Sequence, residues 1–156
     1  MTNVESNSVF DVAKYILNQP EHVSMTTMKL QKLCFYSQSW HAALLQKPLF
    51  QGEFQAWANG PVCYELFEAH RGKFTVTEGD ISQGSLGTFA PESTKVIDEV
   101  LDAYGFLSGA ELSELTHGEP PWQQARAGLP SGTVSHAAIS IDSMSNHCLD
   151  LISEAS

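Results

Sequence analysis

Cysteine and histidine side chains recur at matching intervals on two predicted helices, and these residue types can bind zinc or form a nucleophile–base pair. Cys34 precedes His41 by seven residues, and Cys63 precedes His70 by the same interval. Seven residues span about 10.5 Å along a helix, too far for both side chains to hold one zinc ion. A site that combines the two helices stays open, although C-x-x-C and H-x-x-x-H spacings do not occur. We interpret the four residues as buried thiols and core histidines, and we expect no metal ion or cofactor.

The segment Thr116-His117-Gly118-Glu119 is the second candidate for chemistry, because a histidine and a carboxylate at a helix end could act as acid and base. A structural role is favoured: His117 can interact with the last carbonyl groups of its helix, and Glu119 can accept hydrogen bonds at the start of the next. The patterns G-x-x-x-x-G-K, G-x-G-x-x-G and G-x-S-x-G do not occur. We therefore assign no catalytic residue. A small enzyme with a polar site around His117 and Glu119 stays as an alternative.

The stretch from Ser24 to Leu45 predicts the central helix that would position these side chains. It contains neither proline nor glycine, Thr26 fits an N-cap, and Lys47-Pro48 provides a loop signal after it. One arc of the helical wheel is largely apolar, which predicts a helix covered on almost all sides. The other arc holds polar residues with two large apolar ones among them: Gln31, Lys32, Gln38 and Ser39, with Met28 and Phe35. These two apolar residues meet either another helix of the same chain, which is favoured, or a second protein.

Terminal signals predict further helices on both sides of the central one. They begin at the Ser8 capping box, at Gly60-Pro61, at Pro91, at the Ser108 capping box, at Pro120 and at Asp142. Their stops include Pro20, Gly72, Gly105 and Gly118. Short extended segments or a small hairpin are expected within residues 48–57, 74–76 and 134–141. The predicted fold class is mainly α, an α+β domain with minor β, in which six to seven helices surround the central one.

Length and composition predict one compact domain over residues 1–156, with a core from about 8 to 153. A chain of 156 residues with 42% hydrophobic content can bury a sizeable core. The start of the chain lacks a secretion signal, and no apolar run is long enough to span a bilayer. Three widely spaced cysteines, Cys34, Cys63 and Cys148, suggest free thiols in a reducing compartment. We therefore expect a cytoplasmic protein without a membrane partner.

The net charge of −10 lies entirely in the second half of the chain. Residues 1–73 carry six acidic and six basic side chains, whereas residues 74–156 carry twelve acidic ones against Lys95 and Arg126. Direct binding to nucleic acid is not expected, because phosphate contacts need clustered lysine and arginine. The excess of acidic side chains is compatible with a basic protein partner. A role in solubility alone explains the negative charge about equally well.

Three motifs in order give the chain a resemblance to a known family. They are KLQKLCFYSQSWH; PLF followed by FQAWANGPV and ELF; and LDAYGFLSGAELSELTHGEPPWQQAR. Together they resemble the Panacea domain of SocA-like antitoxins, often described as phage-associated proteins, from about Val9 to the final helix. The matching positions are Lys29, Leu30, Gln31, Lys32, Leu33, Tyr36 and Trp40; Ala56, Trp57, Gly60, Pro61 and Val62; and Thr116, His117, Glu119, Pro121, Trp122 and Ala125. Pro120 departs from the pattern.

The resemblance implies a helical antitoxin that neutralises a cognate toxin protein by direct contact. We expect its interface to combine aromatic side chains with carboxylates. The candidate partner-binding residues are Met28, Phe35, Trp57, Glu119 and Trp122, although the two tryptophans fit a core equally well. A third hypothesis is an acidic, phage-encoded decoy that imitates DNA. The identity of the toxin and the oligomeric state stay open, a homodimer being one option.

Overall fold

The computed structural model describes residues 7–155, which contain seven α-helices, five short strands and two 3₁₀ turns. The helices are α1 (Val9–Leu17), α2 (Thr27–Leu45), α3 (Tyr64–His70), α4 (Pro91–Tyr104), α5 (Gly109–His117), α6 (Pro120–Arg126) and α7 (Ile141–Ala155). The strands are β1 (Ser24–Thr26), β2 (Phe54–Trp57), β3 (Gly60–Cys63), β4 (Thr75–Thr77) and β5 (Ala138–Ile139). The 3₁₀ turns are η2 (Pro20–His22) and η3 (Glu78–Asp80). The predicted fold class, mainly α with minor β, is confirmed.

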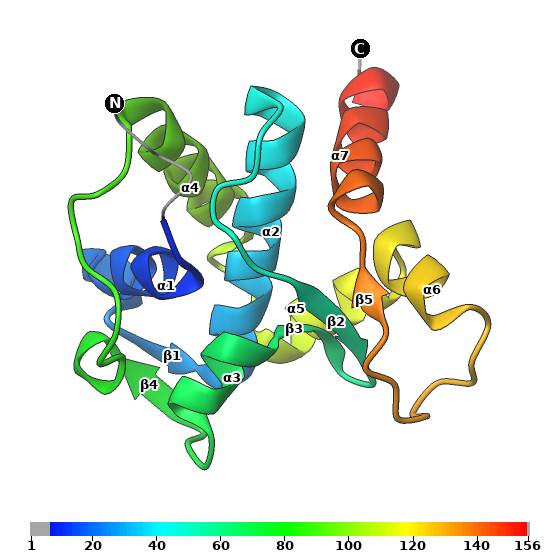
Figure 1. Ribbon diagram of the computed structural model, residues 1–156, viewed down its shortest axis with the longest axis horizontal. Coiled ribbons are helices and arrows are strands. Elements are labelled where there is room, and N and C mark those ends of the chain that lie inside the picture. The colour runs from blue at the N-terminus through cyan, green and yellow to red at the C-terminus, as the bar shows by residue number, and fades with distance from the viewer. Residues whose placement is uncertain (1–6, 156) are drawn as a thin grey trace.

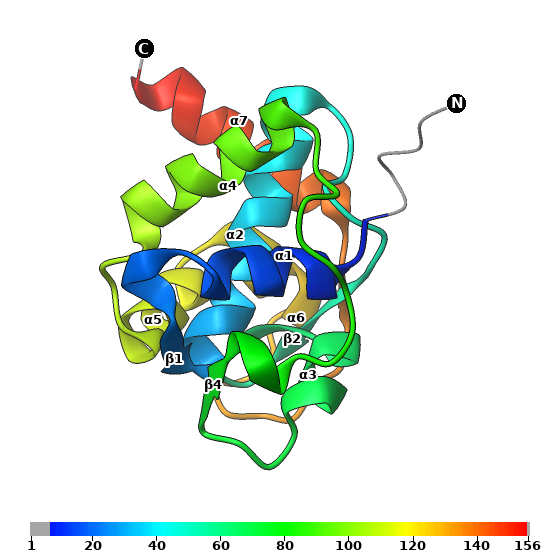
Figure 2. The same cartoon turned by 90° about the vertical axis from the view of Figure 1, so that its left-hand side faces the viewer.

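Helix α2 runs through the middle of the molecule, as the sequence predicted. In Figure 1, α1 and α4 lie on one side of α2 and α7 lies on the other, with β2 and β3 beside its first turns. Figure 2 shows α1 crossing α2, with α4 above it and the β1–β4 pair below. Thirteen of the 19 residues of α2 are buried. The core forms around them, and it includes Val12, Ile16, Leu30, Leu33, Phe54, Leu66, Ile97 and Leu112.

The glutamines on the polar arc of α2 are buried with their hydrogen bonds satisfied, because their side chains pair with backbone N–H and C=O groups of neighbouring segments. The side-chain amide of Gln31 accepts a hydrogen bond from the backbone N–H of Cys63 (2.8 Å) and donates one to the same residue's carbonyl (3.2 Å). Two turns later, Gln38 accepts from the N–H groups of Leu49 (2.7 Å) and Phe50 (3.3 Å) and donates to the Phe50 carbonyl (2.9 Å). Buried backbone groups need such partners. The two glutamines therefore fix the end of β3 and the loop that contains Leu49 and Phe50 to the helix.

Two small antiparallel sheets flank the helices. One pairs β1 with β4, and the other has the order β3-β2-β5. The prediction that Gly60-Pro61 opens a helix is wrong, because both residues belong to β3 and pair with Trp57 and Ala56 of β2. A proline is compatible with this place because β3 is an edge strand, where the missing N–H removes no ladder bond. Helix α3 begins only at Tyr64.

Most of the predicted helix ends are confirmed. Ser8 and Ser108 form capping boxes, and the Thr26 hydroxyl accepts a hydrogen bond from the Lys29 N–H. Gly105 and Gly118 are C-caps. Asp142 does not cap the last helix: α7 begins at Ile141, and the hydroxyl of Ser140 accepts from the Ser143 N–H. The Ser140 side chain reaches the free N–H groups of the first turn, which a residue inside the helix cannot do.

The predicted domain 1–156 extends by residues 1–6 and 156 beyond the described range. In the part that the structure describes, no helix combines the length and the apolar character needed to cross a membrane.

Candidate partner-binding site

The structure brings together two of the five predicted contact residues, Met28 and Trp57. Both line a cavity of about 320 Å³ between the first turns of α2, the β2–β3 turn, α3 and the segment at residues 134–136. Its walls include Met28, Gln31, Lys32, Trp57, Phe67 and His70. Met28 and Trp57 are half-buried. They therefore combine apolar surface with partial exposure, as a contact residue requires.

Phe35 and Trp122, two further candidate contact residues, lie inside the fold, as the core alternative for each of them expected. The Phe35 side chain is 2% exposed and packs edge-on against Phe54 of β2, with ring centroids 5.3 Å apart. The Phe35 ring therefore contacts its own chain, at strand β2. Trp122 is 7% exposed and its indole N–H donates to the Trp57 carbonyl (2.8 Å). Neither ring presents a surface to a second protein.

Lys32 is a buried cation on the wall of the cavity. Its side chain is 1% exposed, and within residues 7–155 it forms neither a hydrogen bond nor an ion pair. Burial lowers the pKa of Lys32 to about 7, because the charged ammonium loses its hydration. The β2–β3 turn makes room for this chain: Gly60 has φ +115°, and a Cβ there would lie 2.6 Å from Lys32 Cε. The hairpin thus covers a lysine without supplying it a counter-ion.

A hydrogen bond between Gln31 and His70 holds the floor of the cavity. The Gln31 amide N–H₂ lies 3.0 Å from His70 Nε2, and because the amide can only donate, that ring nitrogen accepts. The proton of a neutral His70 therefore sits on Nδ1. Burial lowers the pKa of His70, and the nearby Lys32 charge acts in the same direction. The floor is consequently a fixed, neutral imidazole next to the lysine.

Arg126 fixes the segment that forms the outer wall. Its guanidinium, 2% exposed, donates to the carbonyls of Ala56 (2.9 Å), Pro130 (3.2 Å) and Thr133 (2.6 Å). The same group lies over the Trp122 ring at 4.8 Å. Residues 130–136 are thereby tied to β2 and α6, although they have little regular structure of their own.

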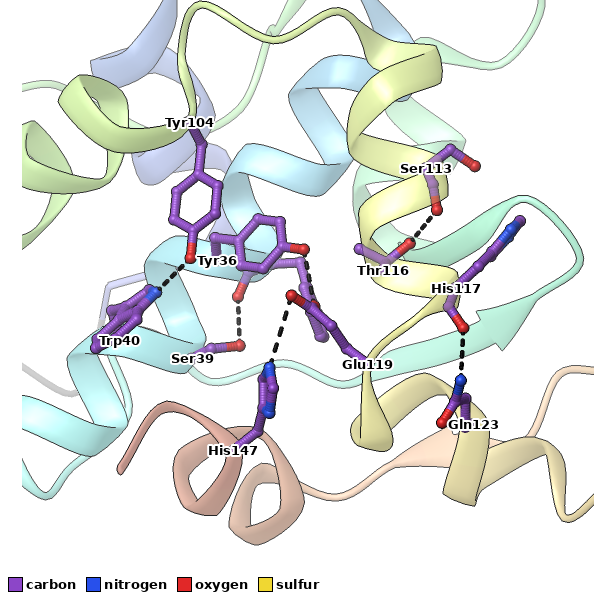
Figure 3. A network of polar contacts seen from close by, with 11 residues as sticks. Tyr36, Ser39, Trp40, Tyr104, Ser113, Thr116, His117, Glu119, Gln123 and His147 are labelled. Atoms are coloured by element: carbon purple, nitrogen blue, oxygen red, sulfur yellow. Dashed lines mark hydrogen bonds and ion pairs between the residues drawn. The ribbon is translucent and has the colours of Figure 1, made fainter. Parts of the chain in front are cut away.

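Glu119 belongs to a different polar network, on the α7 side of α2. Figure 3 shows its carboxylate accepting from the Tyr36 hydroxyl (2.8 Å) and lying 3.6 Å from His147 Nε2. Burial raises the pKa of Glu119, and the contacts with Tyr36 and His147 oppose that rise. The Tyr36 ring stacks on Tyr104 at 4.2 Å. With a side chain 12% exposed, Glu119 ties α2, α6 and α7 together.

His117 and Glu119, which the alternative enzyme hypothesis placed in one polar site, have separate partners in the structure. The His117 ring packs at a tilt against the Trp122 ring, with ring centroids 4.3 Å apart. The His117 carbonyl accepts a hydrogen bond from the Gln123 amide (Figure 3). The partner that the sequence analysis missed is His147, which lies 28 residues further on. The packing of α7 against α2 and α6 brings it there.

The four cysteine and histidine residues of the two seven-residue pairs do not form one cluster. Throughout residues 7–155, no three histidine, cysteine or acidic side chains gather closely enough to hold a metal ion. His41 lies 2.8 Å from both the Lys47 carbonyl and the Ser93 hydroxyl. Cys34 and Cys63 are buried, and burial raises the pKa of both thiols. These contacts are those of core side chains.

Comparison with known proteins gives one match. The model of a family described as "Antitoxin SocA-like, Panacea domain" matches residues 30–123. This range contains Lys32, Trp57, His70 and Glu119, while Met28 and the wall segment 134–136 lie outside it. No curated protein and no solved structure matches the chain.

Proposed function

The chain belongs to the SocA-like antitoxin family with its Panacea domain, and from this membership we propose that it neutralises a cognate toxin protein by binding it directly. The single observation that carries the proposal is the family match, which spans α2 from Leu30 to the middle of α6. The matched region is the central helix with the elements packed around it. In this proposal the antitoxin acts in the cytoplasm as a binding protein and catalyses no reaction.

We place the toxin contact at the mouth of the cavity. Interface anchors are typically apolar or aromatic side chains next to a concave surface. Met28 and Trp57 meet that description, and Val134 beside them is 78% exposed. The Trp57 ring is held by Phe67 at 5.0 Å and His136 at 5.3 Å, so that little side-chain entropy is lost when a partner binds.

Co-expression tests the function. The candidate toxin is the protein encoded next to this chain, and growth of cells that express it should depend on the antitoxin. The two proteins should also co-purify. Growth arrest that the antitoxin does not relieve, together with no complex on size-exclusion chromatography, would contradict the proposal.

Charge insertion tests the place of contact. Met28→Glu with Val134→Glu should weaken toxin binding at least tenfold, because two carboxylates would have to be desolvated in the interface. A carboxylate at position 28 suits the first turn of α2, and Val134 is exposed, so the fold should persist. The matched control is Phe106→Glu, at a 77% exposed position between α4 and α5. If Phe106→Glu loses toxin binding while the double variant keeps it, the interface does not lie at the mouth of the cavity.

A further inference from the structure

We propose that the cavity around Lys32 is a binding site for a carboxylate group carried on an apolar body of about amino-acid size. The charge balance of the cavity favours an anion. The protein has 18 acidic residues, and none of them lies among the described residues that line this cavity. The ionisable side chains there are Lys32, His70 and His136.

The buried Lys32 lacks the hydrogen-bond acceptors that Arg126, another buried cation of this protein, has. Arg126 is equally buried, yet it donates three hydrogen bonds to carbonyl groups. Lys29, three residues before Lys32 on α2, donates a hydrogen bond to the Gly105 carbonyl (2.6 Å). Lys32 has no such acceptor among residues 7–155. A buried charge without a counter-ion is costly, and an entering carboxylate would offset that cost.

The remaining walls determine what carries the carboxylate. Trp57 and Phe67 provide aromatic faces, and Met28, Val62 and Val134 provide aliphatic ones. The side chains of Asn59 and Ser135 can donate hydrogen bonds. A cavity of about 320 Å³ with this lining suits an aromatic or large aliphatic group attached to one acid.

The experiment measures binding of paired probes to the purified chain. The carboxylates are benzoate, phenylacetate and N-acetyl-L-phenylalanine, and the corresponding amides are the neutral controls. Calorimetry should give at least tenfold tighter binding for a carboxylate than for its amide. Backbone NMR shifts should move at Lys32, Trp57 and His70. No binding by any carboxylate, or equal binding of acid and amide, would overturn the proposal.

Two variants separate a role of Lys32 from a general change of the cavity. Lys32→Met keeps the length of the side chain and should abolish the preference for the acid, whereas Lys95→Met, at an exposed position on α4, should leave it unchanged. A retained preference in Lys32→Met would overturn the assignment. Circular dichroism of both variants checks that the chain is folded.

The pH dependence gives a second readout. Carboxylate affinity should fall by up to about tenfold for each pH unit above the pKa of the lysine, because the neutral amine attracts no anion. His70 and His136 also face the cavity, and His136→Gln should retain this fall. A pH-independent affinity between about pH 7 and about pH 9 would contradict the assignment of Lys32.

A free small molecule and an acidic residue of the toxin both present this chemistry. Competition distinguishes them, and only this arm rests on the proposed function. If the probe displaces the toxin, the toxin supplies the carboxylate. If the probe binds the complex unchanged, the ligand is a separate small molecule. Binding of the probe to the isolated chain stands even if the toxin is never neutralised.

Discussion

The burial of Lys32 could not be predicted from the sequence pattern of its own helix. A helical wheel assigns it to a polar arc with Gln31, Gln38 and Ser39, and such an arc usually faces water. In the structure all four are buried, because the β2–β3 hairpin and the loop at residues 47–50 cover that arc. The hairpin is distant in sequence and the loop comes only after the helix has ended, so that the helical period reports neither of them. The motif that carries the family resemblance includes Lys32, which was the one signal that pointed to it.

Replacement of the lysine should change how stability depends on pH. The folded pKa of Lys32, about 7, lies below its ordinary value of 10.5, so that between these values the unfolded chain binds more protons. The penalty for burying the ammonium is fully present below pH 7 and disappears as the pH rises. Lys32→Met should therefore be more stable than the wild type at pH 6, and the difference should shrink by up to about 1.4 kcal/mol per pH unit above pH 7.

Urea unfolding of the two proteins from about pH 6 to about pH 8.5 measures this difference. The range stays below the pH at which Tyr15, Tyr36 and Tyr104, whose pKa values are raised by burial, affect stability in the opposite direction. Lys95→Met should follow the wild type. Parallel curves for Lys32→Met and the wild type would show that the amine is solvated in the folded state.

The elements of this chain differ in how much of their structure is local. Thr26, Ser8 and Ser108 cap their helices with side chains that lie within three residues of the groups they bind, and the sequence predicted all three. Gly60-Pro61 has the same local signal as a helix start, yet pairing with β2 makes it a strand. The β1–β4 and β2–β5 pairs join segments far apart in sequence. Such pairing is decided by tertiary structure rather than by propensity.

Gln38 should be the side chain that attaches the loop at residues 47–50 to α2. Gln38→Leu would leave the N–H groups of Leu49 and Phe50 and the Phe50 carbonyl buried without a partner. Each unpaired group costs about 1–3 kcal/mol, so a loss of roughly 2–4 kcal/mol is expected. Gln83→Leu, in an exposed loop, is the control and should lie within about 0.5 kcal/mol of the wild type. Chemical denaturation measures both, and equal stabilities would mean that water replaces the amide.

At the scale of the whole molecule, the excess negative charge lies in a different part of the chain from most of the Lys32 cavity. The excess of acidic side chains comes from residues 74–156, which include α4, α5 and α7. Within the described part of the chain, no acidic residue lines the Lys32 cavity. A long-range negative field of this kind raises the rate of encounter with a basic partner. The cavity and its apolar mouth would act only after contact. Encounter and retention would thus depend on different parts of the surface.

Salt dependence separates this arrangement from imitation of DNA. For the antitoxin, raising NaCl from about 0.05 M to about 1 M should slow association with the toxin but leave dissociation nearly unchanged, because buried apolar contacts are not screened. A decoy that replaces DNA phosphates should instead lose its affinity by orders of magnitude over the same range. Surface plasmon resonance with the immobilised antitoxin measures both rates. A dissociation rate that rises steeply with salt would favour the decoy and would remove the apolar mouth of the cavity as the site of retention.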